Sequence, residues 1–240
     1  MSEFSFNYIK FYGVKKKVSK KAVILLSGGL DSLTTLAIAK NQGFDCYALH
    51  ILYGQRHASE TKASQKIAEI YEVKEFKKIN IDMSWLKSSA LTNHELNIPE
   101  KRSTGIPVTY VPARNTIMMS LAIAWAETIE ANDLFLGVNA VDYSGYPDCR
   151  PEYINAYEKM VNLATKSAVE GAFFKIHTPL INLSKEEIVK QGMQLNVDYS
   201  MSVSCYQADH EGRACGKCDS CYLREMGFKN AGVIDPTAYK

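Results

Sequence analysis

The sequence predicts an α/β protein with an open, mostly parallel sheet of five strands flanked by helices. Short apolar runs that suit strands buried on both faces alternate with stretches whose apolar residues recur at helical spacing. This alternation is typical of parallel sheets, because a helix-length connection must carry the chain from one parallel strand to the next. A chain of 240 residues is long enough for one such domain with a substantial core.

The first strand and helix are predicted within Lys21–Leu36. The apolar run 22–26 predicts a buried strand, Ser27-Gly28-Gly29 a tight turn, and Leu30 with the apolar positions after it a helix. Glycine lets the backbone approach an anion closely, and the amides of a loop and a helix N-terminus together favour negative charge. The sequence therefore predicts a pyrophosphate-binding loop here.

Three polar side chains of this loop are candidate catalytic residues. Ser27 and Ser32 add hydroxyl donors, and Asp31 is interpreted as a Mg²⁺ ligand, because a carboxylate beside phosphates needs a cation between them. The alternative for Asp31 is that it only stabilises the start of the helix.

Further strands and helices follow in order. Strands are expected at 45–52, 75–81, 133–140 and 173–181, and helices at 57–71, 116–130 and 153–169. Ser184-Lys-Glu-Glu187 is a capping-box pattern that predicts another helix. Lys185 is expected on the surface, the alternative being that it faces the site. The irregular stretch 82–107 is expected to cover or shape the pocket.

Polar residues at the ends of these strands are candidates for binding substrate. Open α/β sheets bind ligands at the carboxyl ends of their strands. Arg114, just before a helix, is predicted to grip phosphate oxygens, the alternative being a structural ion pair. Asp142 or Asp148 is predicted to accept from the N–H edge of a guanine-like ring, and Tyr143 or Tyr146 to stack on it. The substrate candidates are Arg56, Asp142, Tyr143, Asp148 and Arg150.

Four of the six cysteines crowd the end of the chain. Cys205, Cys215, Cys218 and Cys221 have the spacing of a closed tetrahedral Zn²⁺ site, which is a structural rather than a catalytic arrangement. An iron–sulfur cluster is the alternative. Cys46 is expected in the core, and Cys149 is a nucleophile only if a neighbour activates it.

Charge and composition narrow the partners. The net charge of +2 gives no general reason to expect a long nucleic-acid interface, so a small substrate is expected. No apolar run is long enough to span a membrane and no apolar signal core precedes Lys21, so a cytoplasmic protein is predicted. Three parts are predicted: an N-terminal extension (1–20), an ATP-binding α/β domain (21–200) and a small zinc-binding segment (201–240).

Ser27-Gly-Gly-Leu-Asp-Ser32 resembles the phosphate loop of the PP-loop ATP pyrophosphatases, whose fold is the Rossmann-like adenine nucleotide alpha hydrolase type. Together with further motifs, the chain resembles one family of these enzymes, the 7-cyano-7-deazaguanine synthases of queuosine biosynthesis. The stretches that carry this resemblance are 26–36, Tyr53-Gly-Gln-Arg-His57, Tyr110-Val-Pro-Ala-Arg-Asn115, 138–152, Thr178-Pro-Leu180, Ser204-Cys-Tyr206 and Cys215-Gly-Lys-Cys-Asp-Ser-Cys221.

The resemblance implies a C–N ligase, a zinc site at the four cysteines and a homodimer. It implies an ATP site formed by Leu26, Ser27, Gly28, Gly29, Leu30, Asp31, Ser32, Leu33, Thr34, Thr35 and Leu36. The implied reaction converts 7-carboxy-7-deazaguanine and ammonia to the nitrile through an adenylated acid, an amide and an adenylated amide. Two alternatives stay open: a tRNA-modifying member of the superfamily, such as a thiolase or ligase, and a non-enzymatic nucleotide-binding module.

Overall fold

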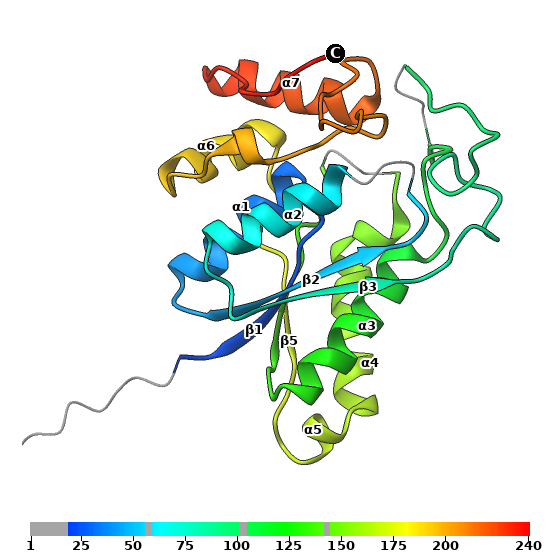
Figure 1. The fold of residues 1–240 in the computed structure, drawn as a ribbon. Helices are drawn as coiled ribbons and strands as arrows, with labels where there is room; N and C mark the ends of the chain where they lie inside the picture. Colours follow the sequence, from blue (N-terminus) through cyan, green and yellow to red (C-terminus); the bar gives the residue numbers. More distant parts are fainter. Residues whose placement is uncertain (1–18, 56–58, 101–104, 142–144) are drawn as a thin grey trace, which may run out of the picture.

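The computed structural model describes residues 19–55, 59–100, 105–141 and 145–240. Its five strands form one sheet in the order β3-β2-β1-β4-β5, and every neighbouring pair is parallel (Figure 1). The strands are β1 (Lys21–Leu25), β2 (Asp45–Leu52), β3 (Glu75–Asn80), β4 (Asp133–Phe135) and β5 (Lys175–His177). The predicted fold class is confirmed.

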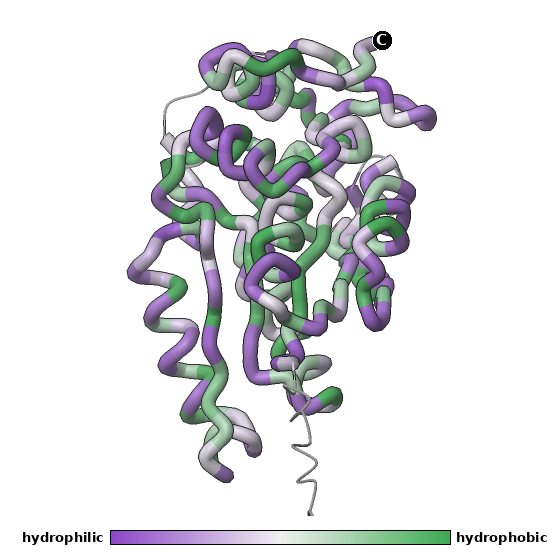
Figure 2. The backbone as a smooth tube through the Cα atoms, turned by 90° about the vertical axis from the view of Figure 1, so that its left-hand side faces the viewer, coloured by the Kyte–Doolittle hydropathy of each residue, from purple (hydrophilic) through white to green (hydrophobic). Residues whose placement is uncertain are grey.

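Helices cover both faces of the sheet (Figure 1). They are α1 (Leu30–Asn41), α2 (Ser59–Ile70), α3 (Arg114–Thr128), α4 (Pro151–Ala164), α5 (Lys166–Val169), α6 (Lys185–Gln194) and α7 (Asp219–Ala231), with 3-10 turns η1 (Pro147–Cys149) and η2 (Tyr199–Met201). Ala22 and Ile24 of β1 pack toward α1, whereas Val23 packs toward α3. Successive strand residues thus serve two cores, which is why the central strands are mostly hydrophobic. Figure 2 shows green stretches of chain in the interior.

Some predicted boundaries were wrong. The strands expected at 133–140 and 173–181 are only three residues long, since the chain after β4 turns past the start of α1. The helix expected at 153–169 is interrupted at Thr165, whose ψ of 146° is extended. Helix α7, which packs beside α6, was not predicted at all (Figure 1).

The stretch from 82 to the start of α3 has no strand or long helix among its described residues. Its apolar side chains, such as Met83, Leu91 and Val111, share a third core with the buried cysteines of the C-terminal segment. Leu91 also reaches the main cavity. The expectation that this stretch helps to shape the pocket is therefore confirmed.

Candidate active site

A cavity of about 260 Å³ opens at the carboxyl ends of the central strands. Strands β1 and β4 are neighbours in the sheet, and the chain leaves them toward opposite sides, which makes the gap between their ends the topological switch point. The lining comes from the loop after β1, from α2 and α3, from α6 and from the C-terminal segment. Segments far apart in sequence thus meet at the place where open α/β sheets bind ligands.

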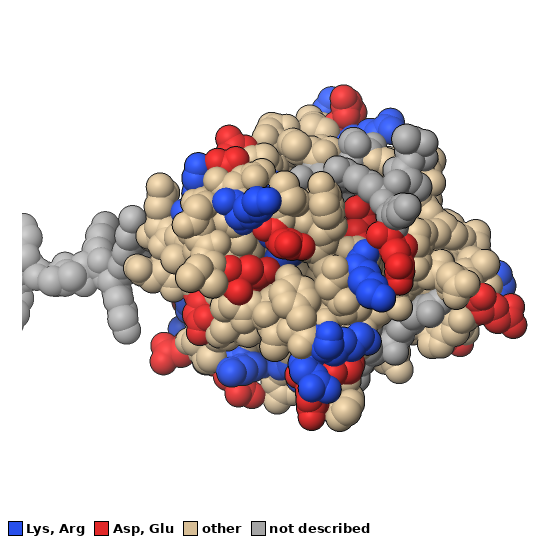
Figure 3. Space-filling view, turned by 90° about the horizontal axis from the view of Figure 1, so that it is seen from above, with Lys and Arg blue, Asp and Glu red and all other residues tan. Residues whose placement is uncertain are grey.

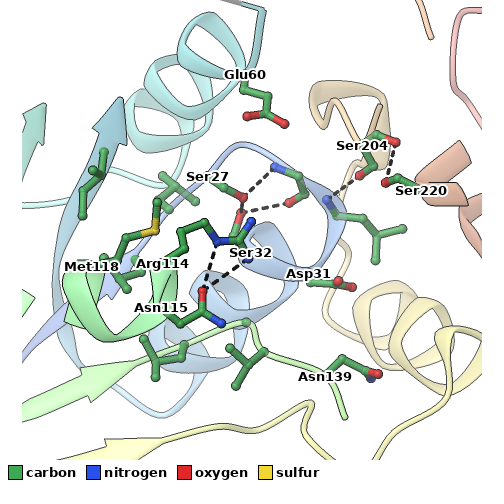
Figure 4. Close-up of a pocket in the computed structure, with 18 of the residues that line it drawn as sticks. Ser27, Asp31, Ser32, Glu60, Arg114, Asn115, Met118, Asn139, Ser204 and Ser220 are labelled. Carbon is green, nitrogen blue, oxygen red and sulfur yellow. Dashed lines mark hydrogen bonds between the residues drawn. The ribbon is translucent and has the colours of Figure 1, made fainter. Parts of the chain in front are cut away.

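Hydrogen bonds of serine hydroxyl groups within the loop after β1 fix the conformation of that loop (Figure 4). The Ser32 hydroxyl accepts a hydrogen bond from the Gly28 amide at 3.2 Å and donates one to the Gly29 carbonyl at 3.0 Å, while Ser27 Oγ lies 3.1 Å from Ser32 Oγ. Ser27, Asp31 and Ser32 all line the cavity, as predicted. The start of α1 therefore presents amides and hydroxyls to the cavity, an arrangement suited to phosphate oxygens.

Two glycines permit close packing around this loop. Gly28 has a φ of +94°, and a Cβ there would lie 2.5 Å from the Glu60 carbonyl oxygen. Gly137, just after β4, would place a Cβ 3.0 Å from the Ser32 amide nitrogen. Only glycine at these two positions lets α2 and the segment after β4 lie so close to the loop. Gly137 was not singled out from the sequence, although a glycine directly after an apolar strand is a recognisable signal.

The predicted nucleotide-binding segment 26–36 reaches the cavity with its first part only. Its lining residues are Leu26, Ser27, Gly29, Leu30, Asp31 and Ser32. Leu33 and Leu36 are residues of α1 whose side chains are buried in the core. The Thr34 hydroxyl donates a hydrogen bond to the Leu30 carbonyl at 2.9 Å. Side chains of residues 33–36 therefore support the loop from behind.

Asp31 is paired with Lys185, whose predicted surface position is wrong. Lys185 Nζ donates to both carboxylate oxygens of Asp31, at 2.7 and 2.8 Å, and only 7% of the lysine is exposed. The capping box at Ser184 is confirmed, and it starts α6 so that its first residue faces the cavity. A cation thus lies beside the loop after β1, so the structure favours the alternative in which Lys185 faces the site.

Arg114 begins α3 and lines the cavity opposite the loop (Figure 4). Its Nε and Nη2 atoms donate to Asn115 Oδ1, both at 3.3 Å. Ala113, just before it, has a φ of +54°, a left-handed conformation that turns the chain into the helix. The guanidinium therefore contacts the Asn115 side-chain amide and also hydrogen-bonds with the Tyr53 side chain. It lines the cavity, on the ligand-facing edge where the sequence places it.

Only some of the residues predicted to contact the substrate lie in the described part of the chain. Arg56, Asp142 and Tyr143 lie outside the described residues. Asp148 is buried, and its carboxylate accepts the Asn115 amide at 3.0 Å, so it satisfies an N-terminal amide of α3. Neither Asp148 nor the exposed Arg150 is among the residues that line the cavity. Their substrate contacts stay predictions.

Glu60 and His50 line the cavity and were missed in the sequence. Burial raises the pKa of Glu60 to about 7, an effect that Arg114 partly offsets. The His50 Nδ1–H donates to the Leu26 carbonyl at 2.9 Å, its Nε2 lies 3.0 Å from the Thr61 hydroxyl, and burial lowers its pKa. Glu60 begins α2 in an ordinary polar stretch, so no sequence signal marks it.

Cys149 faces the same cavity from η1. Its thiol accepts a hydrogen bond from Asn115 Nδ2 at 3.3 Å, and burial raises its pKa to about 11. A thiol with this pKa is almost fully protonated near neutral pH. The environment therefore does not activate Cys149 as a nucleophile.

The C-terminal segment forms direct hydrogen bonds with the loop after β1. The Leu30 amide donates to Ser204 Oγ at 2.9 Å, and the Val203 amide donates to the Gly28 carbonyl at 2.9 Å (Figure 4). The Ser220 hydroxyl in turn donates to the Ser204 carbonyl at 3.0 Å. Ser204 precedes Cys205 and Ser220 precedes Cys221, so the cysteine cluster and the loop share one hydrogen-bonded connection.

The four C-terminal cysteines converge as predicted. All four sulfur atoms lie within 4.8 Å of one another, and Cys218 Sγ is 3.6 Å from Cys221 Sγ and 4.0 Å from Cys205 Sγ. A tetrahedral Zn²⁺ site with bonds of about 2.3 Å has sulfur–sulfur edges of about 3.8 Å, so this spacing fits. Hydrogen bonding among the thiols lowers the pKa of Cys218 and raises those of Cys205 and Cys221. The cluster can hold a metal ion.

The outer surface carries charges of both signs. Lysine, arginine, aspartate and glutamate are interspersed over the coloured part of the face seen from above (Figure 3). Among the described helices, none combines the length and the apolarity that crossing a lipid bilayer requires.

Cys46, expected in the core, is fully buried.

Known proteins with similar sequences cover almost the whole chain. Two 7-cyano-7-deazaguanine synthases are close relatives: the one from Stutzerimonas stutzeri (strain A1501) is 59% identical over 220 residues, covering 92% of this chain and 98% of its own. The one from Methylobacillus flagellatus is 60% identical over 222 residues, covering 92% and 97%.

Solved structures are more distant. NMN synthetase from Francisella tularensis has a TM-score of 0.48 at 19% identity and covers 90% of this chain and 79% of that one. NH3-dependent NAD synthetase from Campylobacter jejuni has a TM-score of 0.44 at 18% identity, covering 78% and 69%. Similarities of this size support no inference about this chain.

The model of the family described as "Queuosine biosynthesis protein QueC" matches residues 21–232, from the first residue of β1 to the residue after α7. This range includes the phosphate loop, Arg114, Lys185 and all four clustered cysteines. The chain belongs to the QueC family of queuosine biosynthesis proteins.

Proposed function

We propose that the chain is a 7-cyano-7-deazaguanine synthase, an ATP-dependent ligase that forms a C–N bond. The observation that carries the proposal is the loop of amides and hydroxyls after β1, which faces Arg114 and Lys185 across one cavity. Two cations and a helix N-terminus around a cavity suit the triphosphate of ATP and the charge that develops as it is cleaved. The relatives' name supplies the identity of the second substrate.

The reaction would proceed by activating one oxygen at a time. The carboxylate of 7-carboxy-7-deazaguanine attacks the α-phosphorus of ATP, and the bond to pyrophosphate breaks. Ammonia then displaces AMP to give the amide. The amide oxygen attacks the α-phosphorus of a second ATP, and the bond to a second pyrophosphate breaks. Loss of AMP from the adenylated amide, together with both protons of its nitrogen, then leaves the nitrile. The loop holds the pyrophosphate, and positioning in line supplies much of the rate.

Two metal ions are part of the proposal. Mg²⁺ would be held near Asp31 and would neutralise charge on the phosphates, and Lys185, which pairs with Asp31 here, would then be free to contact the phosphates. Zn²⁺ would be held by Cys205, Cys215, Cys218 and Cys221, where four thiolates close the coordination shell and leave no open position for catalysis. Its role is to fix the segment that bonds to the phosphate loop.

The assembly and location follow from the resemblance. We propose a cytoplasmic homodimer that takes small molecules and no stable nucleic acid. Large apolar side chains near α4 and α5 are exposed, with Leu163 at 84%, Val169 at 78% and Phe173 at 65%, and such side chains are commonly covered by a second subunit. Sedimentation analysis at several protein concentrations tests the dimer.

The test of the function follows both the base and the adenine nucleotide by mass spectrometry. Purified protein is incubated with ATP, Mg²⁺, an ammonium salt and 7-carboxy-7-deazaguanine. Nitrile with AMP and pyrophosphate supports the proposal. Nitrile with ADP would keep the substrate but contradict cleavage between the α and β phosphates. An untouched acid would contradict the function, and modification of added tRNA would then be measured.

A further inference from the structure

The structure points to a place for ammonia, the second nucleophile of the proposed reaction, and this inference rests on the proposed function. Near neutral pH ammonia is mostly ammonium, which has no lone pair and cannot attack an acyl adenylate. A site that uses ammonium therefore needs a group that attracts the cation and then removes a proton. A carboxylate in the cavity wall has both properties.

Two carboxylates line the cavity among the described residues, Asp31 and Glu60. Asp31 is already paired, because Lys185 Nζ reaches both of its oxygens at 2.7 and 2.8 Å. Its negative charge is offset by this buried lysine. Glu60 lies on the opposite side of the phosphate loop, at the start of α2, with its side chain directed toward the space above Ser27 and Arg114 (Figure 4).

The other titratable groups of the lining are poorly placed to accept a proton. Both ring nitrogens of His50 lie within hydrogen-bond distance of protein atoms, the Leu26 carbonyl and the Thr61 hydroxyl. Cys149 is a buried thiol that Asn115 contacts. Protonated arginine and lysine only donate, the tyrosine hydroxyls of the lining carry no negative charge to attract ammonium, and Cys205 belongs to the cysteine cluster. Glu60 is thus the group that the geometry leaves for this step.

The surroundings of Glu60 suit a base that acts near neutral pH. Two described groups on other elements act on its charge: Arg114 at the start of α3, and Tyr53 after β2. Burial raises the pKa of Glu60 to about 7, with Arg114 opposing this shift. A base is most effective when its pKa lies near the working pH, because it is then both ionised and basic enough.

We propose that Glu60 binds the ammonium ion and removes the proton that frees its lone pair for attack on the adenylated acid. One proton passes from ammonium to the Glu60 carboxylate. The nitrogen lone pair forms the new bond to the acyl carbon, the bond from that carbon to the AMP oxygen breaks, and AMP leaves with the electron pair. The nitrogen then loses a second proton to water, leaving the neutral amide.

The test separates adenylation from amide formation in Glu60→Gln. The exchange of labelled pyrophosphate into ATP in the presence of the acid reports adenylation, which needs no ammonia. We expect this exchange to stay within about threefold of the wild type, while kcat/KM for ammonium at pH 7 falls about 100-fold or more, the usual contribution of a general base. This deficit should shrink as the pH rises and free ammonia replaces ammonium.

Controls keep the result specific. Glu69→Gln removes an exposed carboxylate from the same helix, one that Gln65 contacts at 3.2 Å, and it should leave both steps unchanged. Glu60→Asp should keep part of the ammonium-dependent rate. Unchanged amide formation in Glu60→Gln, equal losses in exchange and amide formation, or a deficit independent of pH would each overturn the assignment. If the wild type shows no acid-dependent exchange, the proposed function fails instead.

Discussion

At the scale of single residues, Lys185 shows how a side chain acquires a role from its neighbours. Its aliphatic stem lies against Gly227 of α7, where a Cβ would come within 2.4 Å of Lys185 Cγ. The stem is thereby packed between helices, and the ammonium group is directed at Asp31 rather than at solvent. A lysine held in this way is ready to meet an anion that enters the loop.

We expect Lys185→Met to weaken binding of ATP and pyrophosphate by about 10- to 100-fold, the effect of losing one charge-assisted hydrogen bond. Isothermal titration with each ligand measures the change. Lys190→Met is the matched control, since Lys190 is on the same helix but exposed and paired with Glu186. Equal effects of the two substitutions would show that Lys185 does not contact the phosphates.

Glu60 also makes a prediction about stability. Its pKa is raised from 4.5 to about 7 in the folded chain, so the folded state favours the protonated form. The group therefore contributes stability below pH 4.5 that is lost as the pH rises toward 7, by up to about 3 kcal/mol at about 1.4 kcal/mol per pKa unit. Glu60→Gln should make the unfolding free energy fall less over this pH range. Urea titrations at several pH values measure it, and parallel curves for the two proteins would contradict it.

At the scale of elements, the segment before the cysteine cluster caps the N-terminus of α1. The Ser204 hydroxyl accepts the Leu30 amide, one of the first amides of that helix, as a capping side chain does. Here the cap comes from a residue 174 positions away. The orientation of the loop is therefore tied to the C-terminal segment as well as to β1.

We expect Ser204→Ala to destabilise the protein by about 1 kcal/mol, the usual cost of losing a capping hydroxyl. The freed amide should also raise the KM for ATP several-fold while the metal content stays unchanged. Thermal unfolding, steady-state kinetics and elemental analysis measure these quantities. Ser167→Ala is the control, because that hydroxyl contacts Glu127 on the far side of the sheet. An unchanged KM would mean that ligand binding tolerates a free Leu30 amide.

The elements around the site were predictable to different degrees. β1, the loop and α1 follow from local pattern, because an apolar run, two glycines and a helical repeat each act within a few residues. Glu60 could not be found in this way, and local pattern could not decide between the surface and the site for Lys185, since both positions depend on contacts with distant segments. Helix α7 escaped prediction because its sequence mixes buried Cys221 and Arg224 with ordinary helix formers and shows no clean apolar stripe.

At the scale of the whole molecule, three cores meet around the cavity. Two lie on the faces of the sheet, and the third joins the irregular stretch after β3 to the cysteine cluster. Buried Arg224 links this end of the chain to the body, donating to the Tyr199 carbonyl at 3.1 Å and to Asp235 Oδ1 at 3.0 Å. The C-terminal segment is thus an integral part of the fold.

Removing a metal from the cysteine cluster should therefore affect more than the tail. We expect chelation, or Cys218→Ser, to lower the melting temperature and to make the segment after residue 201 sensitive to proteases. Affinity for ATP should fall with it, since Ser204 is released. Elemental analysis, limited proteolysis and titration follow the three effects. Metal-free protein with unchanged protection and ATP affinity would contradict this coupling.

The hydrogen bond between Ser204 and the start of α1 has a consequence for the synthesis of the protein on the ribosome. β1 and its loop leave the ribosome early, but the hydroxyl that completes the helix start is synthesised 174 residues later. A nascent chain therefore holds an unfinished nucleotide site during most of its translation. Chains that terminate before Ser204 should contain the complete loop sequence and yet bind ATP poorly, so full affinity for the nucleotide marks a finished protein.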